Sequence, residues 1–374
     1  DRRADYFLTT SSDPQSWLEQ PERVVLVHQG SSGRVLASDF EELSGLAESA
    51  GAMVVGRIGA TRRVPEAGTF VGRGKAQEIA DSVAAQGADL VIVDQAISPV
   101  QERNLEQLTK CRVIDRTRLI LDIFALRAQS HEGKLQVELA QLRHLSTRLV
   151  RGWTHLERQR GGIGLRGPGE TQLETDRRLI GLRIRHLQKR LSKVGLQRSL
   201  RRHRRKRERV PTVAIIGYTN TGKSSLFNRL VEAQSYCADQ LFATLDPTMR
   251  RLELHGFGPV ILSDTVGFIQ GLPHALVQAF LSTLEEVSSA DFLLRVADDS
   301  HPDVREQEAE VERVLEEIGA SHIPSLVIRN KCDASGRDAG LFAGQRHPGP
   351  VIRTSARTGD GVEVVRTQLA RSLS

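Results

Sequence analysis

Short apolar runs alternate with amphipathic stretches over the first third of the chain. The runs have the length of buried strands and lie at residues 24–27, 53–55, 90–93 and 112–114. The stretches that begin at Asp39, Gly74 and Pro99 are typical of helices. Because strands that alternate with helices favour a parallel sheet, we predict a small parallel α/β domain at residues 1–116.

Two long helices are predicted in the middle of the chain, where apolar residues recur at spacings of three and four. The first seam is Leu135, Leu139, Leu142, Ser146, Leu149, Trp153 and Leu156, and the second is Ile180, Ile184, Leu187, Leu191 and Val194. Residues 161–169 between them hold five glycines and a proline, which continue neither helix. We predict an antiparallel coiled-coil hairpin at residues 117–209, whose glycine-rich tip is either a flexible connection or a probe that approaches RNA.

Strand-like runs return after residue 210, and each now ends in a polar motif. The first run, at residues 213–216, leads into G-x-x-x-x-G-K-[ST]. This motif comprises Gly217, Tyr218, Thr219, Asn220, Thr221, Gly222, Lys223 and Ser224, and Ser225 follows it. Its glycines let backbone N–H groups surround an anion at the start of a helix. We predict a phosphate-binding loop in which Lys223 contacts the β- and γ-phosphates and Ser224 binds Mg²⁺. A plain glycine turn is the alternative for this motif alone.

The second motif follows the apolar run at residues 260–262. Asp264 stands at a strand end, where its carboxylate can hold the metal through water, and the Gly267 N–H can meet the γ-phosphate. A glutamine that orients water often follows such a motif, but this chain has Phe268. Hydrolysis must therefore be organised by another group, or be slow until a partner docks.

Two later motifs indicate which base is bound. Asn330, Lys331 and Asp333 follow the run at residues 325–328, and a carboxylate there can accept two N–H bonds from guanine. Adenine lacks that pair of donors. Ser355 and Ala356 would add a backbone contact to the base oxygen. Four motifs in this order predict a P-loop GTPase domain at residues 210–374, which converts GTP to GDP.

A switch loop is predicted between the first two motifs, at residues 241–248. Such a loop needs a hydroxyl that completes the magnesium shell when the γ-phosphate is present, and we assign this role to Thr244 in preference to Thr248. Phe242 joins the predicted nucleotide site. The predicted catalytic residues are Lys223, Thr244 and Gly267, and the predicted metal ligands are Ser224, Thr244 and Asp264.

Positive charge is concentrated in the hairpin. Residues 143–209 hold 21 Lys or Arg against 5 Asp or Glu, a local net charge of +16 in a chain of net charge +6. Such an excess favours a polyphosphate partner, with affinity gained by release of counterions. An acidic lipid surface is the competing partner, although the segment lacks a bulky apolar face with Trp and Phe.

The remaining composition places bounds on the class of protein. The 374 residues include no apolar stretch near the roughly 20 residues that span a bilayer, and no signal segment opens the chain. The three cysteines, at positions 111, 237 and 332, have neither metal-ligand spacing nor an even count. We therefore expect a cytoplasmic protein with reduced cysteines, and a monomer.

Several segments resemble the HflX family of ribosome-associated GTPases. They lie at residues 70–75, 113–117, 131–139 and 161–178, the last with the block Gly-Glu-Thr-Gln-Leu-Glu-Thr-Asp at 169–176. The resemblance implies a cytoplasmic GTPase that binds ribosomal RNA of the large ribosomal subunit and splits stalled or idle ribosomes, with hydrolysis controlling release. Members also hydrolyse ATP. The chain starts at Asp1 without a methionine and stops at Ser374, so we expect a fragment.

Two other functions stay open at this stage. The first is a silencing factor that binds RNA or ribosomes and uses nucleotide mainly as a structural ligand, which Phe268 favours. The second is an RNA-remodelling NTPase, for which we find no second catalytic constellation. The phosphate loop also resembles that of glutamine-lacking GTPases in which an asparagine at the position of Asn220 helps to bind K⁺. An asparagine tolerated in a tight turn is the alternative.

Overall fold

The structure is a computed structural model that describes residues 21–30, 35, 37–61, 64–157, 168–207, 210–232, 241–242, 244–269, 281–343 and 349–374. The described residues up to Ile120 form one compact unit, and those from Leu121 onwards form a second. The two units are described separately.

The first unit is built on a four-stranded sheet of order β2-β1-β3-β4 in which every pairing is parallel. The strands are β1 (Arg23–Gln29), β2 (Met53–Ala60), β3 (Leu90–Val93) and β4 (Arg112–Asp115). The helices are α1 (Glu41–Ser49), α2 (Arg73–Gln86) and α3 (Pro99–Thr109), and the short 3-10 turn η3 (Ala37–Phe40) precedes α1. The central strands are the most apolar because both of their faces are covered. The predicted parallel α/β fold is confirmed.

A chain of charged side chains lies where these strands end. His28 Nδ1 lies 2.7 Å from Asp94 Oδ2, and Arg116 donates to the other oxygen of Asp94 at 2.7 Å. Arg116 also forms an ion pair with Glu42 of α1. Buried charges of this kind need such partners. The hydrogen bond to Asp94 raises the pKa of His28.

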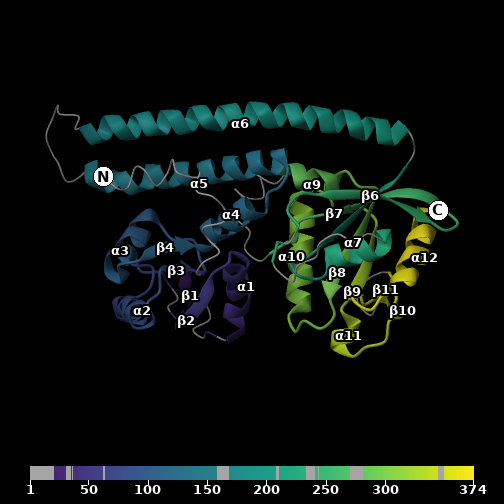
Figure 1. Cartoon of the computed structure of the whole chain (residues 1–374), viewed down its shortest axis with the longest axis horizontal. Helices are drawn as coiled ribbons and strands as arrows, with labels where there is room; N and C mark the ends of the chain where they lie inside the picture. The colour runs from purple at the N-terminus through teal and green to yellow at the C-terminus, as the bar shows by residue number, and fades with distance from the viewer. Residues whose placement is uncertain are drawn as a thin grey trace. The chain divides into compact units, whose positions relative to one another are not determined.

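The second unit begins with three helices. Helix α4 (Arg116–Arg127) crosses the boundary between the units, and α5 (His131–Glu157) and α6 (Pro168–Arg207) lie side by side as an antiparallel pair (Figure 1). Leu135, Leu139 and Leu187 are buried between α5 and α6, and Leu142, Ile184 and Leu191 pack against them. These are residues of the two predicted seams. The side chains of Leu149, Trp153 and Leu156, and residues 158–167, which hold most of the predicted tip at 161–169, lie outside the described part. The last two residues of that predicted tip, Pro168 and Gly169, instead begin α6, where proline is tolerated in the first turn.

The rest of the second unit has a seven-stranded sheet of order β10-β11-β9-β8-β5-β7-β6. The strands are β5 (Thr212–Gly217), β6 (Thr248–Leu254), β7 (Gly258–Asp264), β8 (Phe292–Asp298), β9 (Ser325–Asn330), β10 (Gly340–Phe342) and β11 (Val351–Arg353). Only β6 and β10 pair in the antiparallel sense among these strands. The helices are α7 (Lys223–Val231), α9 (Leu281–Ser288), α10 (Val304–Glu317), the short α11 (Cys332–Ser335) and α12 (Val362–Leu373).

Strand β5 lies between two hydrophobic cores, one on each face of the sheet. Val213 and Ile215 belong to the core that includes residues of α7 and α12, whereas Ala214 and Ile216 belong to the core of α9 and α10. Alternate residues of a strand point to opposite faces, so helices cover both faces of the sheet. The carboxyl ends of the parallel strands β5, β7, β8, β9 and β11 then meet at one edge. Each predicted nucleotide motif follows a strand that ends there.

Candidate nucleotide and magnesium site

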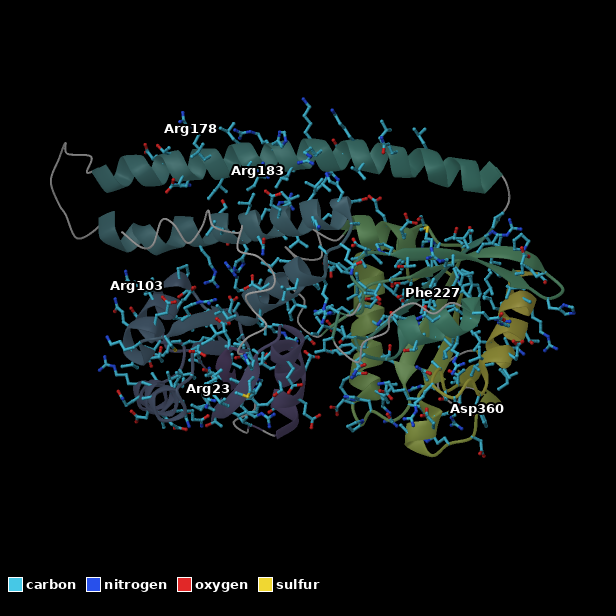
Figure 2. The ribbon with its side chains drawn as sticks, viewed as in Figure 1. Arg23, Arg103, Arg178, Arg183, Phe227 and Asp360 are labelled. Carbon is cyan, nitrogen blue, oxygen red and sulfur yellow. The ribbon has the colours of Figure 1, made fainter. Side chains whose placement is uncertain are left out.

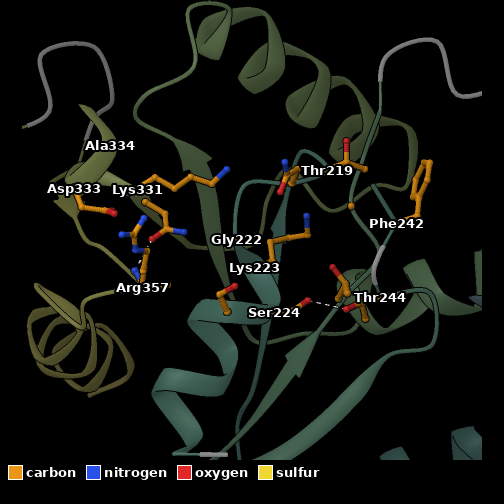
Figure 3. A pocket seen from close by; sticks show the side chains of 16 residues that line it. Thr219, Gly222, Lys223, Ser224, Phe242, Thr244, Lys331, Asp333, Ala334 and Arg357 are labelled. Carbon is orange, nitrogen blue, oxygen red and sulfur yellow. Dashed lines mark hydrogen bonds between the residues drawn. The ribbon is translucent and has the colours of Figure 1, made fainter. Parts of the chain in front are cut away.

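A cavity of about 450 Å³ lies at this edge of the sheet (Figure 3). It is lined by Thr219, Asn220, Gly222, Lys223, Ser224, Ser225, Phe242, Thr244, Thr265, Gly267, Asn330, Lys331, Asp333, Ala334, Ala356 and Arg357. Asp333 and Arg357 lie at one end, Phe242 and Thr244 lie at the other, and Lys223 is between them (Figure 3). A nucleotide placed along this axis would have its base near Asp333 and its terminal phosphates near Thr244.

Both glycines of the phosphate-binding loop are needed for close packing. At Gly217, where φ is 153°, a Cβ would overlap the carbonyl oxygen of Val296. At Gly222, where φ is 84°, a Cβ would overlap the side-chain amide of Asn330. Larger residues would therefore push the loop away from β8 and β9. The glycines fix the loop on the sheet as well as leaving its N–H groups accessible to an anion.

Lys223 is folded back onto this loop. Its Nζ donates a hydrogen bond of 2.6 Å to the Tyr218 carbonyl, and only 6% of the residue is exposed. Burial lowers the pKa of Lys223 to about 8, although the charge of Asp264 opposes this shift. A Cβ at Gly267 would lie 2.8 Å from Nζ, so this glycine leaves room for the ammonium group. A polyphosphate beside the ammonium would favour its charged form.

Three oxygen-bearing side chains from three separate segments converge next to Lys223. Ser224 Oγ lies 2.7 Å from Thr244 Oγ1 and donates to Asp264 Oδ2 at 2.6 Å, and Thr244 Oγ1 lies 3.0 Å from the same oxygen. The second oxygen of Asp264, Oδ1, is buried without a hydrogen-bond partner. Burial raises the pKa of Asp264 even though both hydroxyls oppose it.

This donor set fits a hard divalent cation. Mg²⁺ takes oxygen ligands and keeps several of its waters, and the orphan Oδ1 of Asp264 is an acceptor for such a water. The described residues hold no cluster of His, Cys, Asp and Glu that would suit a softer metal. The predicted ligands Ser224, Thr244 and Asp264 are brought together here. Thr248 instead begins β6, in register with Asp264.

Asn330 connects the phosphate-binding loop to the loop that we expect to contact the base. Its Nδ2 donates to the Thr221 carbonyl at 2.9 Å, and its Oδ1 accepts from the Ala356 N–H at 2.9 Å and from the Thr354 hydroxyl at 3.3 Å. The side chain is 1% exposed, so its hydrogen-bonding groups are used within the protein. Asp333, by contrast, is exposed and lines the cavity, where its carboxylate can face a base.

The comparisons with known proteins agree with this geometry. Three family models match, described as GTP-binding GTPase N-terminal over residues 37–125, GTP-binding GTPase Middle Region over 127–205, and 50S ribosome-binding GTPase over 212–331. GTPase HflX of Escherichia coli strain K12 is 53% identical over 354 residues, which cover 94% of this chain and 83% of the relative. The chain belongs to the HflX family.

Other similar proteins support this family assignment. GTPase HflX of Alkalihalophilus pseudofirmus is 52% identical over 78% of this chain and 69% of the relative. A crystal structure of an SsGBP and GDP complex is 26% identical, with a TM-score of 0.52 over 94% of this chain and 99% of that one. The chain is therefore a GTP hydrolase of a ribosome-binding GTPase family, with the GTPase fold predicted from its motifs.

Several predicted nucleotide ligands do not line the cavity of this HflX-family chain. Thr221 is 1% exposed, and its hydroxyl donates to the Tyr218 carbonyl at 3.0 Å. Ser355 is fully buried, and its Oγ accepts a bond of 3.1 Å from the Thr358 N–H. Gly217, Tyr218 and Asp264 are also absent from the lining. These residues position the loops, and their direct nucleotide contacts stay predictions.

Three residues that the motifs did not assign do line the cavity. They are Thr265, Ala334 and Arg357. Arg357 directly follows Ala356, so its place in the chain was a signal that could have identified it. Arg357 lies near Asp333 at the end of the cavity where we place the base, as does Lys331 (Figure 3). The side chain adds positive charge to the site.

Phe268 has a structural role in place of that of a catalytic glutamine. Its side chain is 3% exposed and belongs to the core shared with α9 and α10. Its N–H donates to the Gly217 carbonyl at 3.1 Å, and its carbonyl accepts from the Thr219 N–H at 2.7 Å. The backbone of Phe268 therefore holds the phosphate-binding loop. Its ring packs in the core and does not line the cavity.

Proposed function

We propose that this HflX-family GTPase binds Mg²⁺ through Ser224, Thr244 and Asp264, and selects guanine through Asp333. The observation that carries the proposal is the convergence of two hydroxyls and one carboxylate beside the buried Lys223. Lys223 and the Gly267 N–H would stabilise charge that develops on the γ-phosphate. Thr244 would complete the metal site when the γ-phosphate is bound. Bound Mg²⁺ would supply charge neutralisation at the β- and γ-oxygens.

We further propose that the α5–α6 hairpin contacts ribosomal RNA of the large subunit, and that the protein separates stalled or idle ribosomes in the cytoplasm. Positions 178, 185, 189 and 193 of α6 are all basic and exposed, and at 100° per residue they lie opposite the seam that faces α5. Arg178 projects away from α5 (Figure 2). A continuous basic face of this kind fits an RNA backbone. No described helix is long and apolar enough to cross a membrane.

Subunit separation by purified protein tests this function. Wild type with GTP is expected to separate ribosomes, and hydrolysis is expected to control its release. Lys223→Ala should abolish turnover, because it removes the buried cation that faces the phosphates. A folded Lys223→Ala protein with unchanged turnover would contradict the site. Ribosome binding without separation, and without multiple-turnover hydrolysis in the presence or absence of ribosomes, would favour the silencing-factor alternative, in which nucleotide is a structural ligand.

The hairpin has its own test. Changing Arg185, Lys189 and Lys193 to Gln should weaken ribosome binding and lower the slope of log affinity against log salt by roughly one per lost phosphate contact. The matched control removes three exposed arginines elsewhere, at positions 250, 305 and 371. Equal losses in both variants would show that only net charge matters, and would refute the hairpin as the contact surface. GTP affinity without ribosomes should not change in either.

A further inference from the structure

Residues on both sides of Thr244 contact the helices that precede the GTPase sheet. Phe242 lies two residues before Thr244, and Asp246 lies two residues after it. The Phe242 ring packs edge-on against the Phe124 ring of α4, with ring centroids 4.7 Å apart, and both side chains are buried. Phe242 also has a φ of 55°, a conformation that a bulky side chain adopts only where packing enforces it.

Asp246 binds the start of α5. Its Oδ2 accepts hydrogen bonds from the backbone N–H groups of Gln129 and Ser130 at 2.9 and 2.7 Å. Its Oδ1 accepts from the Ser130 hydroxyl at 2.5 Å. Ser130 Oγ in turn accepts from the Gly133 N–H at 2.8 Å, as the capping residue of a helix does. The switch loop therefore supplies an anionic cap for α5, where the helix dipole favours negative charge.

Gly133 leaves room for this carboxylate. A Cβ at Gly133 would overlap Asp246 Oδ1 and lie 3.1 Å from Ser130 Oγ. Glycine is otherwise among the least favourable residues inside a helix. The space that Asp246 occupies is therefore a physical reason for a glycine in the first turn of α5.

We propose that Ser130, Gly133 and Asp246 are positioning residues for GTP hydrolysis. The hydrogen bonds of Asp246 to the start of α5 hold Thr244 beside Ser224 and Asp264. The inference rests on the proposed role of Thr244 as a magnesium ligand. Coupling between the nucleotide site and the start of α5 is reciprocal, so a switch loop that binds Mg²⁺ and the γ-phosphate through Thr244 also stabilises the start of α5. A displacement of α5 in turn releases Thr244. RNA bound to the hairpin thus acts on hydrolysis through this junction.

Gly133→Ala tests the proposal, because a Cβ displaces the Asp246 carboxylate while alanine favours the helix itself. We expect kcat and the affinity for a non-hydrolysable GTP analogue to fall about tenfold, which is the scale of a lost charge-assisted hydrogen bond. The Mg²⁺ concentration for half-maximal activity should rise. GDP affinity should not change, because GDP lacks the γ-phosphate that recruits Thr244.

Gly195→Ala is the matched control. This glycine lies inside α6, where a Cβ would meet nothing within 4 Å, so every one of these quantities should stay at its wild-type value. In a double-mutant comparison, Gly133→Ala should add little to the defect of Asp246→Ala, because both remove the same contact. Additive defects would contradict a shared contact.

Two further outcomes would overturn the proposal. The first is a Gly133→Ala protein with wild-type hydrolysis and Mg²⁺ dependence, and the second is an equal loss of GDP and GTP-analogue affinity, which indicates general structural damage. Thr244→Ala separates this failure from failure of the metal site. If Thr244→Ala leaves the Mg²⁺ dependence unchanged, the assignment of the ligand itself is wrong. If it impairs hydrolysis while Gly133→Ala does not, only the positioning inference fails.

Discussion

Replacing Asn330 by alanine should both destabilise the GTPase sheet and abolish nucleotide binding. The side chain connects two loops to the end of β9, because it donates to the Thr221 carbonyl and accepts from the Ala356 N–H and the Thr354 hydroxyl of the loop after β11. It is 1% exposed, so water does not replace these bonds without a rearrangement. Its role is to keep the phosphate-binding loop and the base-binding loops in register.

The magnitude follows from the groups that are left without partners. Leaving a buried donor or acceptor unsatisfied costs about 1–3 kcal/mol. The alanine variant leaves two such backbone groups, those of Thr221 and Ala356, while the longer bond to Thr354 contributes less. A water that enters the vacated space recovers part of this loss. We therefore expect the free energy of unfolding to fall by about 3 kcal/mol.

Urea unfolding without nucleotide measures this change, and amide exchange at Ala356 reports on the lost bond. Asp333→Asn is the matched control in the same loop, because Asp333 is exposed and so contributes little to stability. That variant should unfold like wild type, but it should lose GTP affinity and gain affinity for xanthosine triphosphate. A change below about 1 kcal/mol in Asn330→Ala, with the Ala356 amide still protected, would refute this reasoning.

Three further predictions concern pH and ions. Because burial lowers the pKa of Lys223 to about 8, GTP affinity should be constant below pH 8. Above pH 8 the affinity should fall by up to about tenfold for each unit of pH. Titration calorimetry from pH 7 to 9 measures this change. A constant affinity would mean that Lys223 stays charged. The hydrogen bond from Asp94 raises the pKa of His28, so stability from this pair should be complete below about pH 6.5 and lost as the pH rises through the folded-state value. His28→Gln should remove this pH dependence of the first unit's melting temperature, and an unaltered dependence would contradict the assignment. If Asn220 helps to bind K⁺, turnover should be faster in K⁺ than in Na⁺ at equal ionic strength, and equal rates would exclude the ion.

The sequence predicted the parts of the site that depend on local pattern. The run at residues 213–216 and the eight residues after it became β5, the phosphate-binding loop and the start of α7. The seams at Leu135, Leu139 and Leu187 became the buried contact between α5 and α6. Spacing was sufficient in these cases because a strand or helix of fixed period leaves few alternatives for which face is buried.

The parts that the sequence did not predict depend on contacts between distant segments. Asn330 lines the cavity, and its contact with the nucleotide stays a prediction. The sequence did not predict that its side-chain amide is hydrogen-bonded to Thr221 and Ala356, which are more than twenty residues away in either direction. The environment of the Phe268 ring also depends on distant residues, since the ring belongs to a core with residues of β5, α9, β8, α10 and the loop after α10. The hydrogen bond from the Ser130 N–H to Asp246 joins two residues that are 116 positions apart in the sequence. A local sequence pattern does not predict which loop contacts which helix.

Phe268 and Asp246 together bear on how hydrolysis is controlled. With Phe268 buried, its side chain is not available to orient the attacking water, so the free protein depends on groups that already face the phosphates. Three side chains carry the oxygens that we propose to bind Mg²⁺. Ser224 and Asp264 stand at the start of α7 and the end of β7, whereas Thr244 belongs to a loop. That loop is held by α4 and α5 through Phe242 and Asp246. If the proposed site is correct, a partner that binds the hairpin would change the rate by moving one proposed metal ligand, without contributing a catalytic side chain of its own.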